Sequence, residues 1–220
     1  MYSGVLKRVG AVLLVIGIID GAVTIARPGA AGPYPAALDG VAIIAGLSLV
    51  WGSPRAALWV RMLAVFILAG GAVLAIAAPL FQPLSLTVTE IRLDPAYYAI
   101  TAASLMFVLC VTLWVNFELG RPTVQDAIAS ARIRRWDMVI PAQAGGGVVA
   151  LGGLLLWLAL HGQSADVATS LALQQLGPDY RYHLSWISSS NNGHGTTITG
   201  VVTAWNATEI KKVLLHWESR

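Results

Sequence analysis

The sequence predicts a helical membrane protein with a small mixed α+β domain at its C-terminal end. Of its 220 residues, 56% are hydrophobic and only 11% are charged, whereas a soluble domain carries about 25% charged residues. Five long apolar runs occupy most of the first 160 residues, and the composition turns polar abruptly after Leu160. This number of charged residues is too small to give a folded chain a polar surface. We therefore expect a bilayer to surround the first part of the chain.

The apolar runs predict about five transmembrane helices, because a helical span needs about 20 apolar residues. The runs cover residues 9–26, 36–51, 56–81, 96–117 and 138–160. The run 36–51 is the shortest, and whether it crosses the bilayer unaided is open. The predicted domains are therefore a transmembrane helical domain over residues 1–160 and an extracytoplasmic domain over residues 161–220.

The first run has a second interpretation as part of a cleaved signal peptide over residues 1–30. Lys7 and Arg8 would form its basic region and the following apolar residues its core. Arg27 and Pro28 interrupt the small residues that a cleavage site needs, which favours the membrane span.

The short loops predict the orientation, because cytoplasmic loops carry an excess of Lys and Arg. One side has only Arg27 and Arg92 before the C-terminal domain begins. The other side has eight basic residues: Lys7, Arg8, Arg55, Arg61, Arg121, Arg132, Arg134 and Arg135. We expect a multi-pass protein of a bacterial inner membrane, with its N-terminus in the cytoplasm and its C-terminus in the periplasm.

Two connecting segments have patterns of their own. In residues 82–95, leucine and valine alternate with serine and threonine, which favours an extended strand. A helix lying in the interface also fits, through Leu84, Val88 and Ile91. Residues 121–137 predict a short amphipathic helix on the cytoplasmic surface, followed by a basic cluster. That cluster is either an ordinary positive-inside signal or a contact for anionic lipid, and it consists of Arg132, Arg134 and Arg135.

Residues 161–220 predict one helix followed by a three-stranded antiparallel sheet. The helix begins near Ser164 and ends at Gly177, a residue that commonly terminates helices. Three alternating or β-rich runs follow, with turn residues between them. The expected core of the domain is Leu171, Tyr182, Leu184, Trp186, Val213, Leu215 and Trp217.

The C-terminal domain is small for independent folding, and Cys110 is the only cysteine, so no intrachain disulfide can support it. We therefore expect the domain to lean on another surface. The candidates are the bilayer, the segment 82–95, or a second copy of the chain.

The fifth run contains small residues at helical spacing, which allow another helix to approach closely. This stripe would pack within the chain against Gly70 and Gly71 of the third run, or form a homo-oligomer contact. Its residues are Ala142, Gly146, Ala150 and Gly153.

Two carboxylates form a candidate intramembrane polar site. Asp20 lies inside the first apolar run, and Asp39 lies at the start of the second. In the predicted topology both are in the outer half of the bilayer. Acids inside a membrane are costly and often functional, so they predict either a proton or cation site or simply a solvated pair near the interface.

The sequence predicts no catalytic, cofactor-binding or metal-binding residue and no nucleic-acid partner. In a meander, His183 and His216 would lie on the outer strands about 10 Å apart, too far apart to share a zinc ion. No nucleophile motif such as G-x-S-x-G occurs. We expect a non-enzymatic inner-membrane protein whose external domain binds a partner, assists complex assembly or senses a periplasmic signal. The alternative is a small transporter or channel subunit that uses Asp20 and Asp39.

Overall fold

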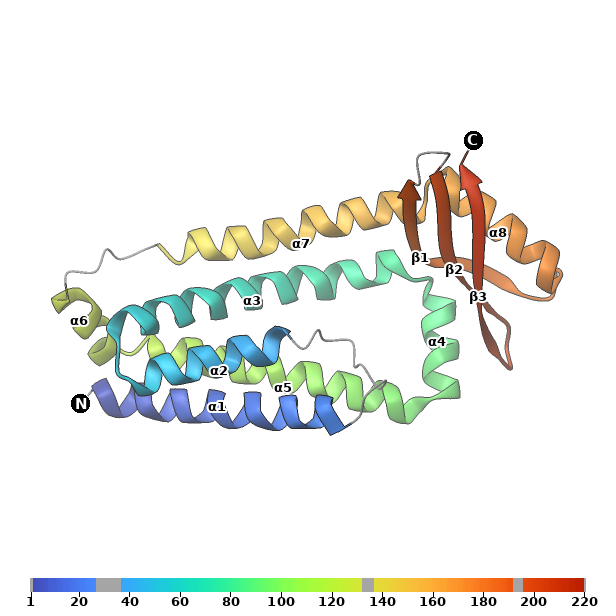
Figure 1. Cartoon of the computed structure of the whole chain (residues 1–220). Helices are drawn as coiled ribbons and strands as arrows, with labels where there is room; N and C mark the ends of the chain where they lie inside the picture. Colours follow the sequence, from blue (N-terminus) through green and yellow to red (C-terminus); the bar gives the residue numbers. More distant parts are fainter. Residues whose placement is uncertain (1, 27–36, 132–136, 192–195, 220) are drawn as a thin grey trace. The chain divides into compact units, whose positions relative to one another are not determined.

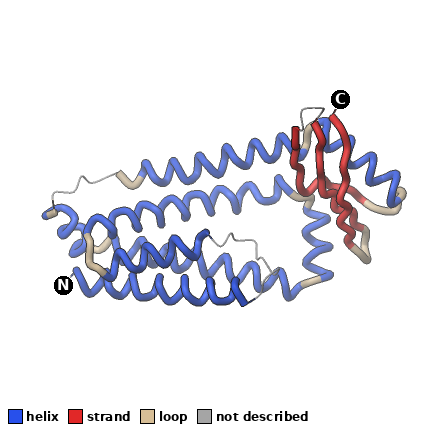
Figure 2. The backbone as a smooth tube through the Cα atoms, in the orientation of Figure 1, coloured by secondary structure: helices blue, strands red, loops and turns tan. Residues whose placement is uncertain are grey.

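The computed structural model describes all residues except 1, 27–36, 132–136, 192–195 and 220. The chain is mostly helical and ends in a three-stranded antiparallel sheet (Figure 1 and Figure 2). The helices are α1 Tyr2–Ala26, α2 Ala37–Val50, α3 Pro54–Phe81, α4 Leu84–Leu93, α5 Pro95–Leu119, α6 Pro122–Ser130, α7 Val139–Leu160 and α8 Gln163–Leu176. The strands are β1 Arg181–Asn191, β2 Thr196–Trp205 and β3 Ile210–Ser219.

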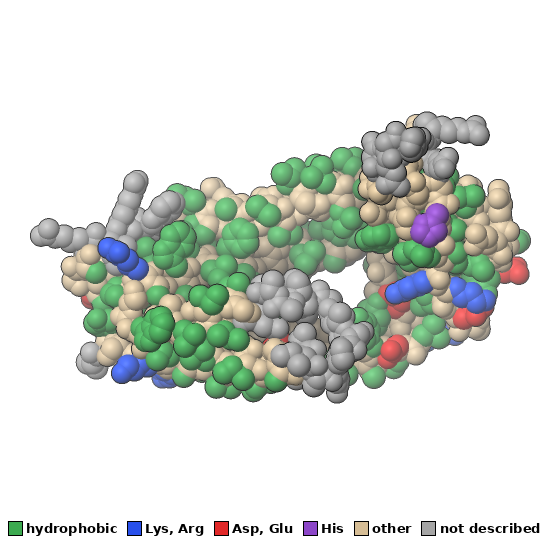
Figure 3. Space-filling view, in the orientation of Figure 1, with side chains coloured by type: hydrophobic (Ala, Val, Ile, Leu, Met, Phe, Trp, Pro, Cys, Tyr) green, Lys and Arg blue, Asp and Glu red, His purple; other side chains and the backbone are tan. Residues whose placement is uncertain are grey.

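Within the described residues, three helical stretches are long and apolar enough to cross a bilayer. They are Pro54–Ala78 of α3, Pro95–Leu119 of α5 and Val139–Leu160 of α7. Figure 3 shows hydrophobic side chains over much of the helical surface, with many of the charged side chains toward helix ends. Such a surface fits hydrocarbon rather than water, so these helices indicate a membrane protein. The expected span 36–51 corresponds to α2, whose stretch Gly40–Val50 is apolar but shorter.

The chain forms two compact units. The first contains Met1–Ala69 and Phe107–Gly145, and the second contains Gly70–Met106 and Gly146–Arg220. Helices α3, α5 and α7 contribute residues to both. The predicted boundary after residue 160 falls between α7 and α8.

In the first unit, α1 and α2 form a closely packed helix pair. Gly10 and Gly46 lie at the contact, and both are buried. A Cβ atom on Gly46 would lie 2.8 Å from the Gly10 carbonyl oxygen, and one on Gly10 would lie 2.7 Å from the Gly46 carbonyl oxygen. Only residues without side chains allow two helix backbones to come this close.

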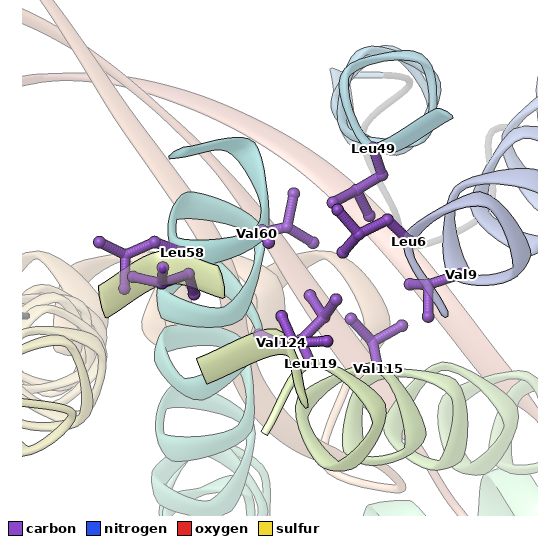
Figure 4. Close-up of a cluster of buried hydrophobic side chains, with 11 residues drawn as sticks. Leu6, Val9, Leu49, Leu58, Val60, Val115, Leu119 and Val124 are labelled. Atoms are coloured by element: carbon purple, nitrogen blue, oxygen red, sulfur yellow. The ribbon is translucent and has the colours of Figure 1, made fainter. Parts of the chain in front are cut away.

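The core of the first unit lies where α1, α2, α3, α5 and α6 meet (Figure 4). Helix α6 buries Val124 and Ile128 in it, so the amphipathic helix expected within residues 121–137 is confirmed. The buried members are Leu6, Val9, Leu49, Ala57, Leu58, Val60, Ala64, Val115, Leu119, Val124 and Ile128.

In the second unit, the strand order β1-β2-β3 confirms the predicted meander. Helix α8 packs on one face of the sheet and ends at Gly177, whose φ of 83° is a conformation that glycine tolerates best. Below, α8 and the three strands are called the C-terminal module. Its core contains Leu160 of α7, Ala165, Ala168 and Ala172 of α8, and Leu184, Val202 and Leu215 of the sheet.

One expected core residue lies elsewhere, for a local reason. The β1–β2 register shifts between Leu184 and Trp186, which is a β-bulge at Ser185. The extra residue turns Trp186 away from α8, and its side chain is 49% exposed. Ile187 packs against the core instead. Strict alternation of side chains is what the sequence prediction assumed, and the bulge breaks it.

The segment 82–95 also differs from the favoured expectation, because Leu84–Leu93 is the helix α4 and not a strand. Its apolar residues recur at helical spacing, with Leu86 buried and Leu84, Val88 and Ile91 exposed. Pro83 fits the helix start. Proline has no backbone N–H, and at this position no intrahelical hydrogen bond requires one.

Candidate functional site

A hollow of about 390 Å³ lies between α4 and one end of the sheet, within the second unit. Its lining combines two guanidinium groups, a carboxylate, an amide, two hydroxyls and an indole. The residues are Ser85, Thr89, Arg92, Asp179, Arg181, Trp205, Asn206 and Ala207. The hollow is the candidate binding site of the protein, because several polar groups converge on one apolar floor.

Helix α4 and the β2–β3 turn are joined at this hollow by a hydrogen bond. Arg92, in the last turn of α4, donates from Nη2 to the carbonyl oxygen of Ala207 at 3.0 Å. This bond ties the C-terminal module to the segment 82–95, which is one of the three supports that the sequence suggested. The hollow therefore has walls from both segments.

The β2–β3 turn is held in shape by Asn206. Its Oδ1 accepts hydrogen bonds from the backbone N–H groups of Thr208 and Glu209, at 2.9 Å and 3.0 Å. This is the local turn that asparagine favours. The wall formed by Asn206 and Ala207 is consequently fixed before any ligand arrives.

A polar cluster supports the same end of the sheet from outside the hollow. Glu209 accepts hydrogen bonds from the hydroxyl of Tyr180 and from Lys211, whose Nζ lies 2.9 Å away. These two bonds lower the pKa of Glu209. The hydrogen bonds to Tyr180 and Glu209 raise the pKa of Lys211. Both groups stay charged near neutral pH.

The charges that line the hollow are available to a ligand. Within the described part of the chain, neither Asp179 nor Arg181 takes part in an ion pair. Both side chains are exposed, whereas Trp205 beneath them is only 5% exposed. Arginine presents a planar fork of donors suited to carboxylates and phosphates. The hollow can therefore bind a group that carries an acid beside an apolar or donor-bearing portion.

His183 joins β1 to the end of α3, and His161 lies near it. The Nε2 of His183 lies 2.9 Å from the carbonyl oxygen of Phe81, the last residue of α3. His161 follows α7, stacks on Trp157 at 4.9 Å between ring centroids, and lies 6.4 Å from the His183 ring. Because a carbonyl oxygen only accepts, His183 must carry a proton on Nε2.

The environment of His183 favours its neutral form. Burial lowers its pKa, the hydrogen bond to Phe81 opposes that effect, and the nearby His161 lowers the pKa further. The ring therefore acts as a neutral donor to the end of α3 at physiological pH.

Helix α4 is also fixed on its other side. Glu90 accepts hydrogen bonds from Gln82 Nε2 at 2.5 Å and from the hydroxyl of Tyr98 in α5. The carboxylate thus joins the residues before α4 to the start of α5, two residues from Arg92.

A second cluster of charges lies in the first unit, and its acid is buried and paired. Glu118, near the end of α5, has a side chain that is only 5% exposed. Its two oxygens accept from Arg8 at 2.7 Å and from Arg121 at 2.6 Å. Each oxygen of the buried carboxylate accepts from one arginine, so this cluster is structural and leaves no carboxylate oxygen for a ligand.

The predicted intramembrane acids are placed only in part. Asp20 lies in α1 with an exposed side chain, and Asp39 lies in the first turn of α2, where its side chain is outside the described residues. Gly10 faces Gly46 across the α1–α2 pair. Counting from this contact at 1.5 Å per residue puts the two acids within about one helical turn in height.

The small-residue stripe of α7 faces α3 at two of its positions. A Cβ atom on Gly146 would lie 3.5 Å from Val73, and one on Gly153 would lie 2.9 Å from the ring of Phe81. Ala142 is half-buried and Ala150 is exposed. These positions favour packing within the chain, while a homo-oligomer contact through the stripe stays a prediction. The basic residues Arg132, Arg134 and Arg135 lie outside the described residues.

No group of three or more histidine, cysteine, aspartate or glutamate side chains converges on a possible metal position in the described ranges. The sequence analysis did not identify the hollow, because its walls come from residues 85–92 and 179–207 and no local pattern pairs these segments. The only signal was Arg92, a basic residue on the side that carries few. Comparisons with family models, curated proteins and solved structures found no match for this chain.

Proposed function

We propose that the chain is a non-enzymatic integral membrane protein that docks a partner protein in the hollow between α4 and the sheet, and so assists the assembly of a membrane complex. One observation carries this proposal. The hollow brings together an acid and a base without ion-pair partners, Asp179 and Arg181, and the buried side chain of Trp205. Arginine and tryptophan are enriched among the residues that dominate protein–protein binding.

The chemistry of the lining supports binding instead of catalysis. The residues that line the hollow include no histidine, cysteine or lysine. The hydroxyl of Thr89 already donates to the Ser85 carbonyl oxygen at 2.9 Å. An activated nucleophile requires an adjacent base, and the lining provides only the exposed Asp179. A partner's acidic side chain beside an apolar one would match Arg181 and Trp205.

In the proposed topology all five apolar runs cross a bacterial inner membrane, so α1 and α2 are spans in addition to α3, α5 and α7. The N-terminus is cytoplasmic, and the hollow faces the periplasm. An alkaline phosphatase fused after Arg220 should be active and a green fluorescent protein fused there should be dark. The reverse result would overturn this orientation.

The test of docking uses two substitutions that change the net charge equally. Arg181→Gln removes a positive charge from the hollow, and Gln174→Glu adds a negative charge on the exposed surface of α8. Each variant is purified from native membranes in mild detergent, and co-purifying proteins are quantified by mass spectrometry. We expect Arg181→Gln to lower recovery of a specific partner by about ten-fold or more, as for loss of one central contact of about 1.4 kcal/mol.

The Gln174→Glu variant should retain the partner. Equal recovery with both variants would show that the hollow is not the docking site. The wild-type protein purifying alone, as a single species, would contradict the accessory function itself.

A second function, transport by Asp20 and Asp39, is favoured by one observation, the similar height of the two acids along the α1–α2 pair. Proteoliposomes that contain the Asp20→Asn and Asp39→Asn double variant should then lose proton or cation flux while the protein remains folded. Unchanged flux would exclude this function.

A further inference from the structure

The sheet face opposite α8 contains a row of three apolar side chains, of which two are exposed and the middle one is half-buried. The register pairs Trp186 of β1 with Val201 of β2, and Val201 with Leu214 of β3. We call these three residues the open row. Trp186 is 49% exposed and Leu214 is 58% exposed, although both occupy the middle of their strands. Two exposed apolar side chains that flank a half-buried valine on one face of an ordered sheet indicate a surface that is covered in the native environment.

Burial on this face falls off with distance from α4 and the end of α3. Trp205, which lines the hollow beside α4, is 5% exposed. Thr203, opposite His183, is 2% exposed, and the His183 ring contacts the end of α3. The next row along the strands is the open row. The helices of the second unit thus cover one part of the face and stop short of the other.

At His183, this face meets the end of one helix that can cross a bilayer and lies near the residue that follows another. His183 contacts Phe81, three residues beyond the span Pro54–Ala78, and the His161 ring, which follows the span Val139–Leu160, lies beside His183. Figure 1 shows the strands running crosswise to α3 and α7, next to the ends of both helices. The surface that continues outward from the ends of membrane-spanning helices is the lipid headgroup layer.

The side chains around the open row suit that layer. Tryptophan is enriched at the membrane–water interface, because its ring is apolar and its N–H is polar. Lys212 and His216 of β3 lie on the same face, on either side of Leu214, and both are exposed. A lysine near an anionic membrane surface contributes about 1 kcal/mol of attraction.

We propose that the open row is a membrane-contacting surface that rests in the headgroup layer beside α3 and α7. The bilayer then covers the part of the sheet that α4 and α3 leave bare. The bulge at Ser185 contributes to this surface, because it turns Trp186 from the module core to the open row. Docking in the hollow does not depend on this contact, so each proposal can fail alone.

The test measures the depth of a nitroxide label in the full chain, reconstituted in nanodiscs of phosphatidylcholine and phosphatidylglycerol. The single cysteine, Cys110, is first replaced by alanine. One variant then carries Leu214→Cys in the open row. A matched control carries Leu173→Cys on α8, where the leucine is 46% exposed on the other side of the module. Collision rates with oxygen, which concentrates in lipid, and with a neutral nickel chelate, which stays in water, are measured by electron paramagnetic resonance.

We expect the label at position 214 to collide more with oxygen and, by roughly two-fold or more, less with the nickel chelate than the label at 173. That is the behaviour of a group buried in the outer 5–10 Å or so of a membrane. A Trp186→Cys label should give the same result. Labels at 214 and 186 that behave like the one at 173 would overturn the proposal, since the row would then face water. Labels shielded from both reagents would also overturn it, because a protein surface would cover the row.

Discussion

Two clusters in this chain use the same residue types and reach opposite outcomes. In the first unit, Arg8 and Arg121 close on the buried carboxylate of Glu118. In the second, Arg92 and Arg181 share a hollow with Asp179, and Arg92 bonds a backbone carbonyl instead of the acid. A buried acid must be paired, because leaving it unpaired costs several kcal/mol. An exposed acid is solvated by water and can stay unpaired until a ligand binds. The difference in burial therefore distinguishes the structural cluster from the candidate site.

The two units are also held together differently: the first by close helix packing, the second by individual hydrogen bonds. Close backbone contact at Gly10 and Gly46 holds the helix pair of the first unit. In the C-terminal module, the hydrogen bonds from Arg92 to Ala207 and from His183 to Phe81 connect the sheet to α4 and α3. The variants below test this contrast, from the largest expected effect to the smallest.

Gly46→Val should give the largest loss of stability, up to about 3 kcal/mol, because the new side chain meets the Gly10 backbone and the helices must separate. Thermal unfolding of the full chain in detergent measures it. Gly40→Val is the control in the same helix, since a Cβ atom at Gly40 meets nothing within 4 Å. Similar losses for both variants would show that close packing is not the cause.

Glu118→Gln should cost about 1–2 kcal/mol, because it removes the charge that Arg8 and Arg121 share. The loss is below that of a fully buried pair, since both arginines are about half exposed and can be solvated. The same thermal measurement applies. A variant as stable as the wild type would mean that the cluster is not structural.

His183→Gln tests the pH dependence of the link between β1 and α3. Burial lowers the pKa of His183 in the folded protein, so the unfolded chain takes up a proton first as the pH falls below about 6.5. The folded state therefore loses stability as the pH falls below about 7, and no such loss occurs above about pH 7. Glutamine can still donate to Phe81 but does not titrate. We expect the melting temperature of the variant to fall less over this range, and an identical fall would contradict the assignment.

Asp179→Asn should have the smallest effect, below about 0.5 kcal/mol, as for an exposed residue without an ion pair. It is the same acid-to-amide change as Glu118→Gln, so the two melting temperatures compare the clusters directly. A large loss at Asp179 would show that the hollow is a structural cluster too.

Several features could be predicted from local sequence because local physics fixes them. Gly177 ends α8 through a backbone conformation that glycine adopts at little cost. The amphipathic face of α6 and the alternation in β3 follow from the periods of helix and strand. The candidate site could not be predicted in this way. Arg92 and Arg181 are far apart along the chain, and their place in one hollow depends on how α4 meets the sheet.

The sequence by itself determined that this is a membrane protein with a β-meander module, since hydrophobicity and side-chain period are properties of consecutive residues. Only the tertiary structure decided which charges are paired and which are open. It also decided that 84–93 is a helix and that Trp186 leaves the core. These outcomes depend on contacts between segments that are distant in sequence. The pattern of neighbouring residues does not specify which distant segment will pack against them.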